Sequence, residues 1–178
     1  MTSFSKLENV FAAVVSGTVF FFLFHLNDFL FSQLTYSTGV NWVFLPSGLR
    51  LLLVLMFAGS GAVGVMLGSL VVGLDRPVSL EVTCAAAVIS GLSPWLARWV
   101  CLRAMRIRSD LKEINALRLL QMALVFAMVS AVLHQALYTG AGLSPSFLEG
   151  TAVMAIGDLL GTMVVLYAVK LALWRPGH

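Results

Sequence analysis

The chain alternates between long apolar runs and short polar breaks, and this pattern predicts an all-α integral membrane protein. None of the runs shows the period-2 alternation of a membrane-spanning strand, so each is expected to be a helix. A helix also satisfies its backbone groups internally, which hydrocarbon requires. We predict one domain over residues 1–178, a helical bundle of about six transmembrane spans. The spans cover residues 7–33, 46–58, 62–74, 79–101, 117–138 and 146–174.

The second and third predicted spans are shorter than the others. A helix needs about 20 residues to cross a bilayer, and residues 46–58 and 62–74 both fall short of that length. Pro46 suits the first turn of a helix, and the Gly-Ser-Gly segment at 59–61 predicts a tight turn between the two spans. We therefore expect this pair either to recruit flanking residues or to form a hairpin that crosses only in part.

Composition excludes a soluble domain. Of the 178 residues, 60% are hydrophobic and 11% are charged, and a soluble domain of this size cannot bury that much apolar surface. Membrane lipid is therefore an expected partner. The formal net charge of +3 follows the loops between spans, so it indicates topology and not nucleic-acid binding. Cys84 and Cys101 lie too far apart along one predicted helix to form a disulfide.

Basic residues between the fourth and fifth spans set the expected orientation. Cytoplasmic loops of membrane proteins are enriched in Lys and Arg, and six of the eleven such residues lie in or beside this loop. They are Arg98, Arg103, Arg106, Arg108, Lys112 and Arg118. Threading outward from the loop leaves Arg50 and Arg76 on the opposite side. We predict an N-in, C-in protein of the bacterial cytoplasmic (inner) membrane.

A few ionisable side chains interrupt the apolar runs and are the candidate site residues. They are His25, Asp28, Arg50, His134 and Asp158. A charge in hydrocarbon is costly, so such residues are expected to face a protein interior or a cavity. His25 and Asp28 lie three residues apart, hence on one helix face. Nearly all of these residues fall in the outer half of the spans, which predicts an outward-facing polar pocket between helices.

Three interpretations of these residues remain open. In the first, they satisfy one another and hold the bundle in register, with Arg50 paired to Asp158 or Asp28. The rise of 1.5 Å per residue places Asp158 about 10 Å deeper than Arg50, which a long arginine side chain covers in part. In the second, Arg50 binds an anionic small-molecule ligand while Asp158 or Asp28 takes a donor. In the third, His25 and His134, at similar depth, bind a metal or haem iron; no further motif supports it, and we assign no cofactor.

Small residues mark close helix contacts, and catalytic motifs are missing from the sequence. Gly157 and Gly161 are four residues apart in the last span, a spacing that lets two helices approach closely. Pro46 and Gly48 belong to the Phe-Leu-Pro-Ser-Gly-Leu segment at 44–49 that opens the second span.

The sequence contains no G-x-S-x-G, no H-E-x-x-H and no phosphate-binding glycine loop. We therefore predict a protein that is not an enzyme.

The order of these motifs is similar to that of a known family. The chain resembles the MASE-type membrane-associated sensor domains of bacteria, which precede diguanylate cyclase, phosphodiesterase and histidine kinase modules. That family starts one helix with Trp-Pro-x-x-Gly, continues with a glycine-rich helix, and carries Gly-Asp-x-x-Gly near the end of its membrane region. The segments that resemble these motifs are 45–48 (Leu-Pro-Ser-Gly, with one residue fewer between Pro and Gly), 59–73 with its glycines, and 157–161 (Gly-Asp-Leu-Leu-Gly). Residues 91–98 (Gly-Leu-Ser-Pro-Trp-Leu-Ala-Arg) resemble the family's helix before a basic loop.

The resemblance implies a sensory membrane domain, with three further departures from the family pattern. Leu45 stands where the family has Trp, Arg50 adds a charge, and we expect no output module beyond residue 178. The implied function is a stand-alone sensor that binds a ligand or senses membrane state and acts through a membrane or cytoplasmic partner protein. Two alternatives stay open: an accessory or assembly subunit of a larger membrane complex, and a small-molecule transporter or its substrate-binding subunit.

Overall fold

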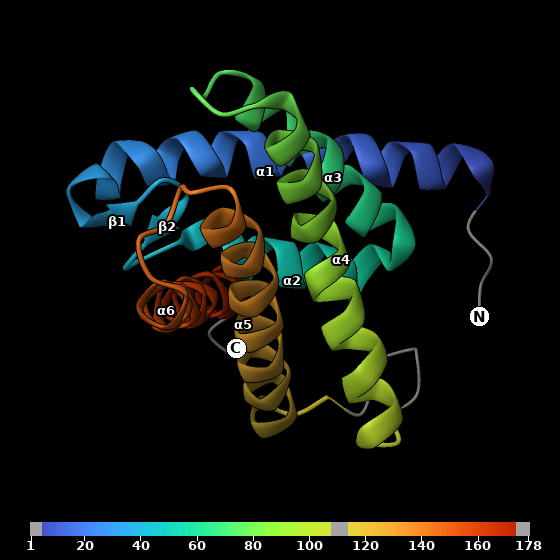
Figure 1. Ribbon diagram of the computed structural model, residues 1–178. Coiled ribbons are helices and arrows are strands. Elements are labelled where there is room, and N and C mark those ends of the chain that lie inside the picture. The colour runs from blue at the N-terminus through green and yellow to red at the C-terminus, as the bar shows by residue number, and fades with distance from the viewer. Residues whose placement is uncertain (1–4, 108–113, 174–178) are drawn as a thin grey trace.

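The computed structural model describes residues 5–107 and 114–173, and this part of the chain is almost entirely helical (Figure 1). The helices are α1 (Lys6–Phe31), α2 (Leu45–Phe57), α3 (Gly59–Leu74), α4 (Leu80–Ala104), α5 (Ala116–Gly140) and α6 (Phe147–Leu173). The six predicted helices are confirmed, and their ends differ from the predicted ones by at most three residues. The predicted end of the last span, Trp174, lies outside the described residues.

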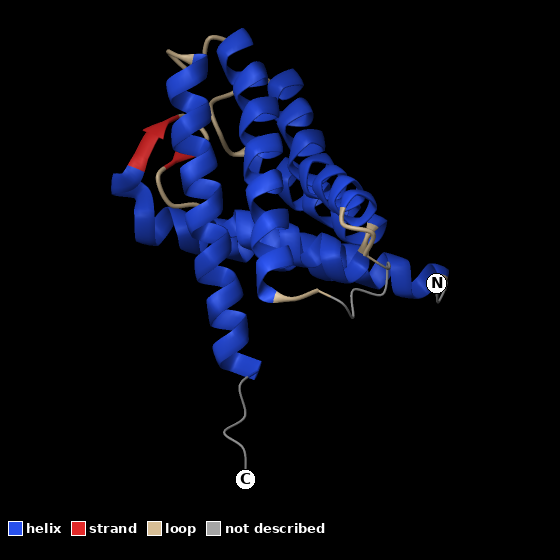
Figure 2. Cartoon of the chain, turned by 90° about the horizontal axis from the view of Figure 1, so that it is seen from below, coloured by secondary structure: helices blue, strands red, loops and turns tan. Residues whose placement is uncertain are grey.

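The link between α1 and α2 is a small β-hairpin, which the sequence did not predict. It follows a short 3-10 turn, η1 (Ser32–Leu34), and consists of β1 (Thr35–Ser37) and β2 (Val40–Asn41). The strands are antiparallel, and Gly39 in their turn has a φ of 76°, which favours glycine. Figure 2 shows the hairpin at one edge of the bundle. Strands of three and two residues are too short for their alternation to stand out in the sequence.

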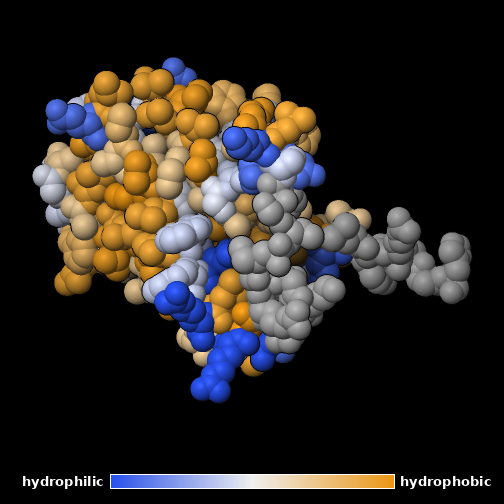
Figure 3. Space-filling model, turned by 90° about the vertical axis from the view of Figure 1, so that its right-hand side faces the viewer, coloured by the Kyte–Doolittle hydropathy of each residue, from blue (hydrophilic) through white to orange (hydrophobic). Residues whose placement is uncertain are grey.

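Among the residues that the structure describes, four helices are long and apolar enough to cross a membrane, namely α1 with its 3-10 turn, α4, α5 and α6. The other two, α2 with 13 residues and α3 with 16, extend over about 20 and about 24 Å, less than the ~30 Å of a hydrocarbon core. Large apolar side chains remain exposed, such as Phe29 at 82% and Leu148 at 78%. Figure 3 shows hydrophobic residues over most of one face of the molecule. Helix length and surface together indicate a membrane protein.

A single residue separates α2 from α3. Ala58 has a φ of 50°, and its N–H donates to the carbonyl of Val54. The predicted turn at 59–61 is therefore wrong, because these residues form the first turn of α3. A Cβ on Gly61 would collide with the carbonyl oxygen of Leu53. The glycine thus allows α3 to start directly against α2.

The central helix of the bundle is α2. It contacts each of the other five helices, and ten of its 13 residues are buried. The helix α3 packs against both α1 and α4, and in Figure 1 α1 runs crosswise to α4 and α5. A Cβ on Gly64 of α3 would collide with the carbonyl oxygen of Ala13 of α1. Such close backbone contacts hold helices together in lipid, where no hydrophobic effect acts between them.

Candidate functional site

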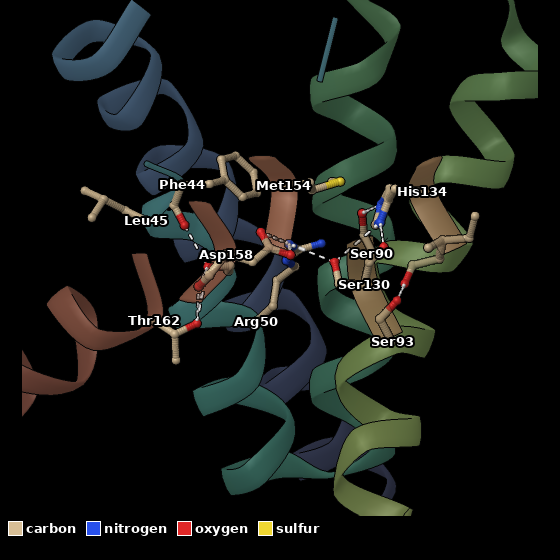
Figure 4. A network of polar contacts seen from close by, with 12 residues as sticks. Phe44, Leu45, Arg50, Ser90, Ser93, Ser130, His134, Met154, Asp158 and Thr162 are labelled. Carbon is tan, nitrogen blue, oxygen red and sulfur yellow. Dashed lines mark hydrogen bonds and ion pairs between the residues drawn. The ribbon is translucent and has the colours of Figure 1, made fainter. Parts of the chain in front are cut away.

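A group of buried polar residues lies around an ion pair between Arg50 of α2 and Asp158 of α6 (Figure 4). Arg50 Nη2 lies 3.2 Å from Asp158 Oδ1 and 3.4 Å from Oδ2. The two side chains are 1% and 0% exposed. The same Nη2 lies 3.5 Å from the hydroxyl of Ser130 on α5. Of the pairings that the sequence left open, the structure forms the one between Arg50 and Asp158, and it links three helices.

Two aromatic rings enclose the Arg50 guanidinium. Its Cζ lies 5.3 Å from the ring centroid of Phe44 and 5.4 Å from that of Phe126. An aromatic face attracts a cation, more strongly when water is excluded. The Nε of Arg50 is buried and has no hydrogen-bond partner among the described residues. The site therefore holds a desolvated cation with one N–H donor that is not yet used.

The start of α2 lies inside the bundle, where neighbouring helices supply its hydrogen-bond acceptors. The first backbone N–H groups of a helix have no partner within that helix. Here the N–H of Leu45 donates to Asn27 Oδ1 of α1 at 2.8 Å. The N–H of Phe44, just before the helix, donates to the carbonyl of Gly157 on α6 at 3.1 Å. The beginning of α2 is thus level with the middle of α6.

This placement corrects the predicted depths of the ion-pair residues. The sequence placed Asp158 about 10 Å deeper than Arg50, because residues were counted from span ends assumed to lie at one membrane surface. Since α2 starts beside Gly157, and not at the level where α6 begins, the Arg50 side chain lies within reach of Asp158. The expected offset in depth is therefore wrong.

The motif residues lie together where the chain enters α2. They are Pro46, Gly48, Gly157 and Gly161. A Cβ on Gly161 would collide with the carbonyl oxygen of Phe44, and a Cβ on Gly48 would lie 2.8 Å from the Cα of Thr162. The glycines therefore permit a contact between the backbones of α2 and α6 that larger residues would prevent, and this contact surrounds the ion pair.

His134 of α5 belongs to the same polar cluster. Its Nδ1 lies 2.9 Å from the carbonyl oxygen of Ser130, and because a carbonyl only accepts, Nδ1 carries a proton. Its Nε2 lies 3.3 Å from the hydroxyl of Ser90 on α4, to which Ser69 of α3 donates at 3.0 Å. Both ring nitrogens are therefore engaged within the protein.

His25 lies apart from this cluster. It is exposed on α1, and its ring packs edge-on against Phe21 with centroids 4.4 Å apart. The structure thus leaves His25 on the surface while His134 is buried, and it does not bring them to a shared metal or haem site. Within the described residues, no group of three or more His, Cys, Asp and Glu side chains could hold a metal ion.

Asp28 forms a second ion pair, with Arg76 in the link after α3. The side chains of Arg76 and Asp28 are 34% and 41% exposed. The guanidinium of Arg76 also lies over the ring of Phe24, 4.9 Å from its centroid. The alternative in which Arg50 pairs with Asp28 is therefore wrong.

A cavity of about 90 Å³ lies between the two ion pairs. Its polar lining includes Arg50, Arg76, His134 and Tyr138, and much of the remaining lining is apolar. The hairpin and the links after α3 and α5 also contribute lining residues. The cavity lies at the end of the bundle where these three links lie, and of the predicted site residues Arg50 and His134 line it, whereas His25, Asp28 and Asp158 do not.

The chain matches no protein-family model, curated protein or solved structure. The likeness to MASE-type sensor domains therefore remains a prediction carried by its motifs. A proposal for function rests on the cavity, the two ion pairs and the helices that hold them.

Sequence reasoning missed several uncharged members of the polar cluster. They include Ser90 and Ser130, both of them buried, and two further buried polar residues, Asn27 and Gln135, were missed elsewhere in the bundle. One signal was present, because Ser130 and His134 are four residues apart and hence on one helix face. Hydroxyl and amide groups do not break an apolar run as a charge does, so they stood out less in the sequence.

Proposed function

We propose that the protein is a sensor-like integral membrane protein that binds a small ligand in this cavity and signals occupancy through α6. The observation that carries the proposal is that Arg50 belongs to both the cavity wall and the buried ion pair. It lines the cavity, and it is also the ion-pair partner of Asp158 on α6. A ligand that draws the guanidinium toward itself weakens the contact to Asp158, so ligand binding favours a different packing of α6.

Only the first part of α6 packs within the bundle. The rest of the helix can therefore move and transmit the signal of ligand binding. Its last buried residue is Thr162, and the described side chains after it are half-buried or exposed. In Figure 2 the final turns of α6 project from the body of the molecule toward the C-terminus. A change in packing at Asp158 therefore displaces a helix end that a partner protein can contact.

We place the cavity on the outer side of the bacterial inner membrane and the projecting end of α6 on the cytoplasmic side. Positively charged loops favour the cytoplasm. The described basic residues near the link from α4 to α5 are Arg98, Arg103, Arg106 and Arg118, while Arg108 and Lys112 lie outside the described residues. If α2 and α3 both cross, or if they form a re-entrant pair, they return the chain to the side where α2 began. Both arrangements give N-in and C-in.

The resemblance to MASE-type domains supports a sensory function. The two motifs that carry it, at 45–48 and 157–161, lie against each other around the Arg50–Asp158 pair. A sensor requires two conformations with different ligand affinity. Arg50 lines the cavity and pairs with Asp158 on α6. A ligand that binds Arg50 therefore competes with Asp158 for the guanidinium.

Native mass spectrometry of the chain, extracted in mild detergent from its host membrane, tests the proposal. We expect a retained small-molecule mass and a partner protein in fixed stoichiometry. Arg76→Gln, which changes the cavity wall, is expected to lose the small molecule. Arg103→Gln is the matched control, because Arg103 stacks on Trp99 and does not line the cavity.

Other outcomes, of that experiment and of a separate uptake assay, would contradict the sensor. A partner without any small molecule, unchanged in Arg76→Gln, would indicate an accessory subunit. Substrate uptake that is lost in a folded Asp158→Asn variant would indicate a transporter.

A further inference from the structure

Both ion pairs turn their cationic member toward the cavity. Arg50 and Arg76 line it, whereas their carboxylate partners, Asp158 and Asp28, do not. No Asp or Glu of the described chain is among the lining residues. Each pair therefore acts as a dipole whose positive end faces the cavity. By Coulomb's law this wall favours an anion over a cation.

The two arginines of this wall carry N–H donors that their ion pairs do not use. The Nε of Arg50 is buried and has no partner among the described residues, and a buried donor without an acceptor costs free energy. Arg76 uses Nη2 for Asp28, and a guanidinium has five N–H donors in all. A carboxylate is the acceptor that best matches such donors, because it can take two of them at once.

The remaining wall and the size of the cavity restrict the rest of the ligand. Its apolar lining includes Phe20, Phe24, Val72 and Leu143. An apolar cavity of about 150 Å³ holds benzene, so the part of a ligand that enters the 90 Å³ here is a smaller group. An inorganic anion would leave the apolar wall without contacts, and a nucleotide would not fit. A short alkyl chain matches both the volume and the lining.

We infer that the cavity binds a short-chain monocarboxylate. The carboxylate faces Arg50 and Arg76, and the alkyl tail lies against the phenylalanine rings. This inference rests on the proposed ligand-binding function, and it adds the chemical class of the ligand. It does not depend on whether α6 transmits the signal.

Isothermal titration calorimetry on the full chain, in nanodiscs of zwitterionic phosphatidylcholine, tests the inference with probes of similar size. Butyrate, butyramide and n-butylamine share a short apolar tail and differ in charge. We expect saturable binding of one butyrate per chain, at least tenfold weaker binding of butyramide, and no binding of butylamine. Acetate retains the carboxylate but lacks two methylenes, so we expect it to bind roughly tenfold more weakly than butyrate.

A matched pair of variants separates the charge of the wall from the ion pair itself. Arg76→Gln and Asp28→Asn both break the pair, but only Arg76→Gln removes a cation from the cavity wall. We expect Arg76→Gln to weaken butyrate binding at least tenfold, and Asp28→Asn to bind as tightly as wild type or more tightly. Melting curves of both variants establish that they are folded.

Several results would overturn the ligand class. They are equal affinity for butyrate and butyramide, equal loss of binding in both variants, or no butyrate binding to a chain that melts normally. The distance between spin labels at Leu117 of α5 and Leu171 of α6, both exposed, distinguishes this failure from failure of the sensor proposal. Butyrate that binds without changing this distance overturns transmission and leaves the ligand class intact. If butyramide or butylamine binds and changes the distance, the ligand class is overturned and transmission is left intact.

Discussion

The described part of the chain contains two arginine–aspartate pairs, which differ mainly in burial. The Arg50–Asp158 side chains are 1% and 0% exposed at the centre of the bundle, whereas those of Arg76 and Asp28 are 34% and 41% exposed. When one partner of a buried pair is removed, the other is left as an uncompensated charge. An exposed partner is instead solvated and contributes little to stability. The same chemistry therefore secures the fold at one site and leaves a guanidinium accessible at the other.

The comparison also separates two tasks in the proposed sensor. Both arginines line the cavity, but only Arg50 is bonded to α6. Arg76 is bonded to α1 through Asp28. Changes at Arg76 are therefore expected to act on ligand binding, and changes at Asp158 on folding and on the position of α6.

The largest expected effect is that of Asp158→Leu, which leaves Arg50 buried without its partner. Loss of one member of a buried pair costs about 3–5 kcal/mol, so the free energy of unfolding in mixed micelles should fall by that order. The double variant Arg50→Leu with Asp158→Leu removes both charges and should recover most of the loss. Unchanged stability of Asp158→Leu would show that Asp158 does not face the protein interior.

The next effect concerns the backbone contact around the buried pair. Gly161→Ala places a methyl group against the carbonyl oxygen of Phe44, and overpacking of this kind costs about 1–3 kcal/mol. Gly140→Ala is the matched control, because a Cβ there meets nothing within 4 Å. The same unfolding measurement checks both variants. Equal stability of the two would argue against direct contact between α6 and the start of α2.

A smaller effect is expected from Asp28→Asn. The pair with Arg76 is more than one-third exposed on its aspartate side, so water replaces much of what is lost. Its removal should change the free energy of unfolding by about 0–1 kcal/mol. A loss as large as that of Asp158→Leu would remove the distinction between the two pairs.

The smallest effect is expected at the hairpin, where the stability of the contact with α6 depends on pH. The hydroxyl of Tyr36 donates to Glu149 Oε2 of α6 at 2.9 Å, and this hydrogen bond raises the pKa of Tyr36 above its usual value. A pKa raised by folding gives stability that is complete below the unfolded value, about 10 for tyrosine. That stability is lost as the pH rises through the folded pKa. The contact between the hairpin and α6 should therefore weaken only in alkaline solution.

Spectrophotometric titration of the three tyrosines checks this. The difference between wild type and Tyr36→Phe isolates Tyr36, which should ionise above pH 10. Glu149→Gln should lower the pKa of Tyr36 toward its usual value. An unchanged Tyr36 titration in Glu149→Gln would contradict the hydrogen bond.

The helices could be predicted because each long apolar run has one stable form in lipid, and Gly or Pro marks several of their ends. The hairpin at Thr35–Asn41 was missed because its strands are too short to show a period. The pairing of Arg50 with Asp158 rather than Asp28 could not be selected from sequence. It depends on α2 beginning beside Gly157, inside the bundle, and a count of residues from a membrane surface does not contain that information.

The uncharged polar cluster was hidden for a related reason. Ser90 and Ser130 come from different helices, and they gain importance only when tertiary packing brings both to His134. The charged residues were recognisable one by one, because each is costly in lipid unless a partner is present. Which partner each one takes is a property of the packed bundle.

The most direct test of the coupling between the cavity and α6 is the distance between spin labels at Leu117 and Leu171, measured by pulsed electron paramagnetic resonance. The labels are placed in a background in which Cys84 and Cys101 are replaced by alanine, because both cysteines are free thiols. Asp158→Asn releases α6 from Arg50, so its distance distribution should shift or broaden relative to wild type, whereas that of Asp28→Asn should not. An unchanged distribution in a folded Asp158→Asn variant would contradict the account.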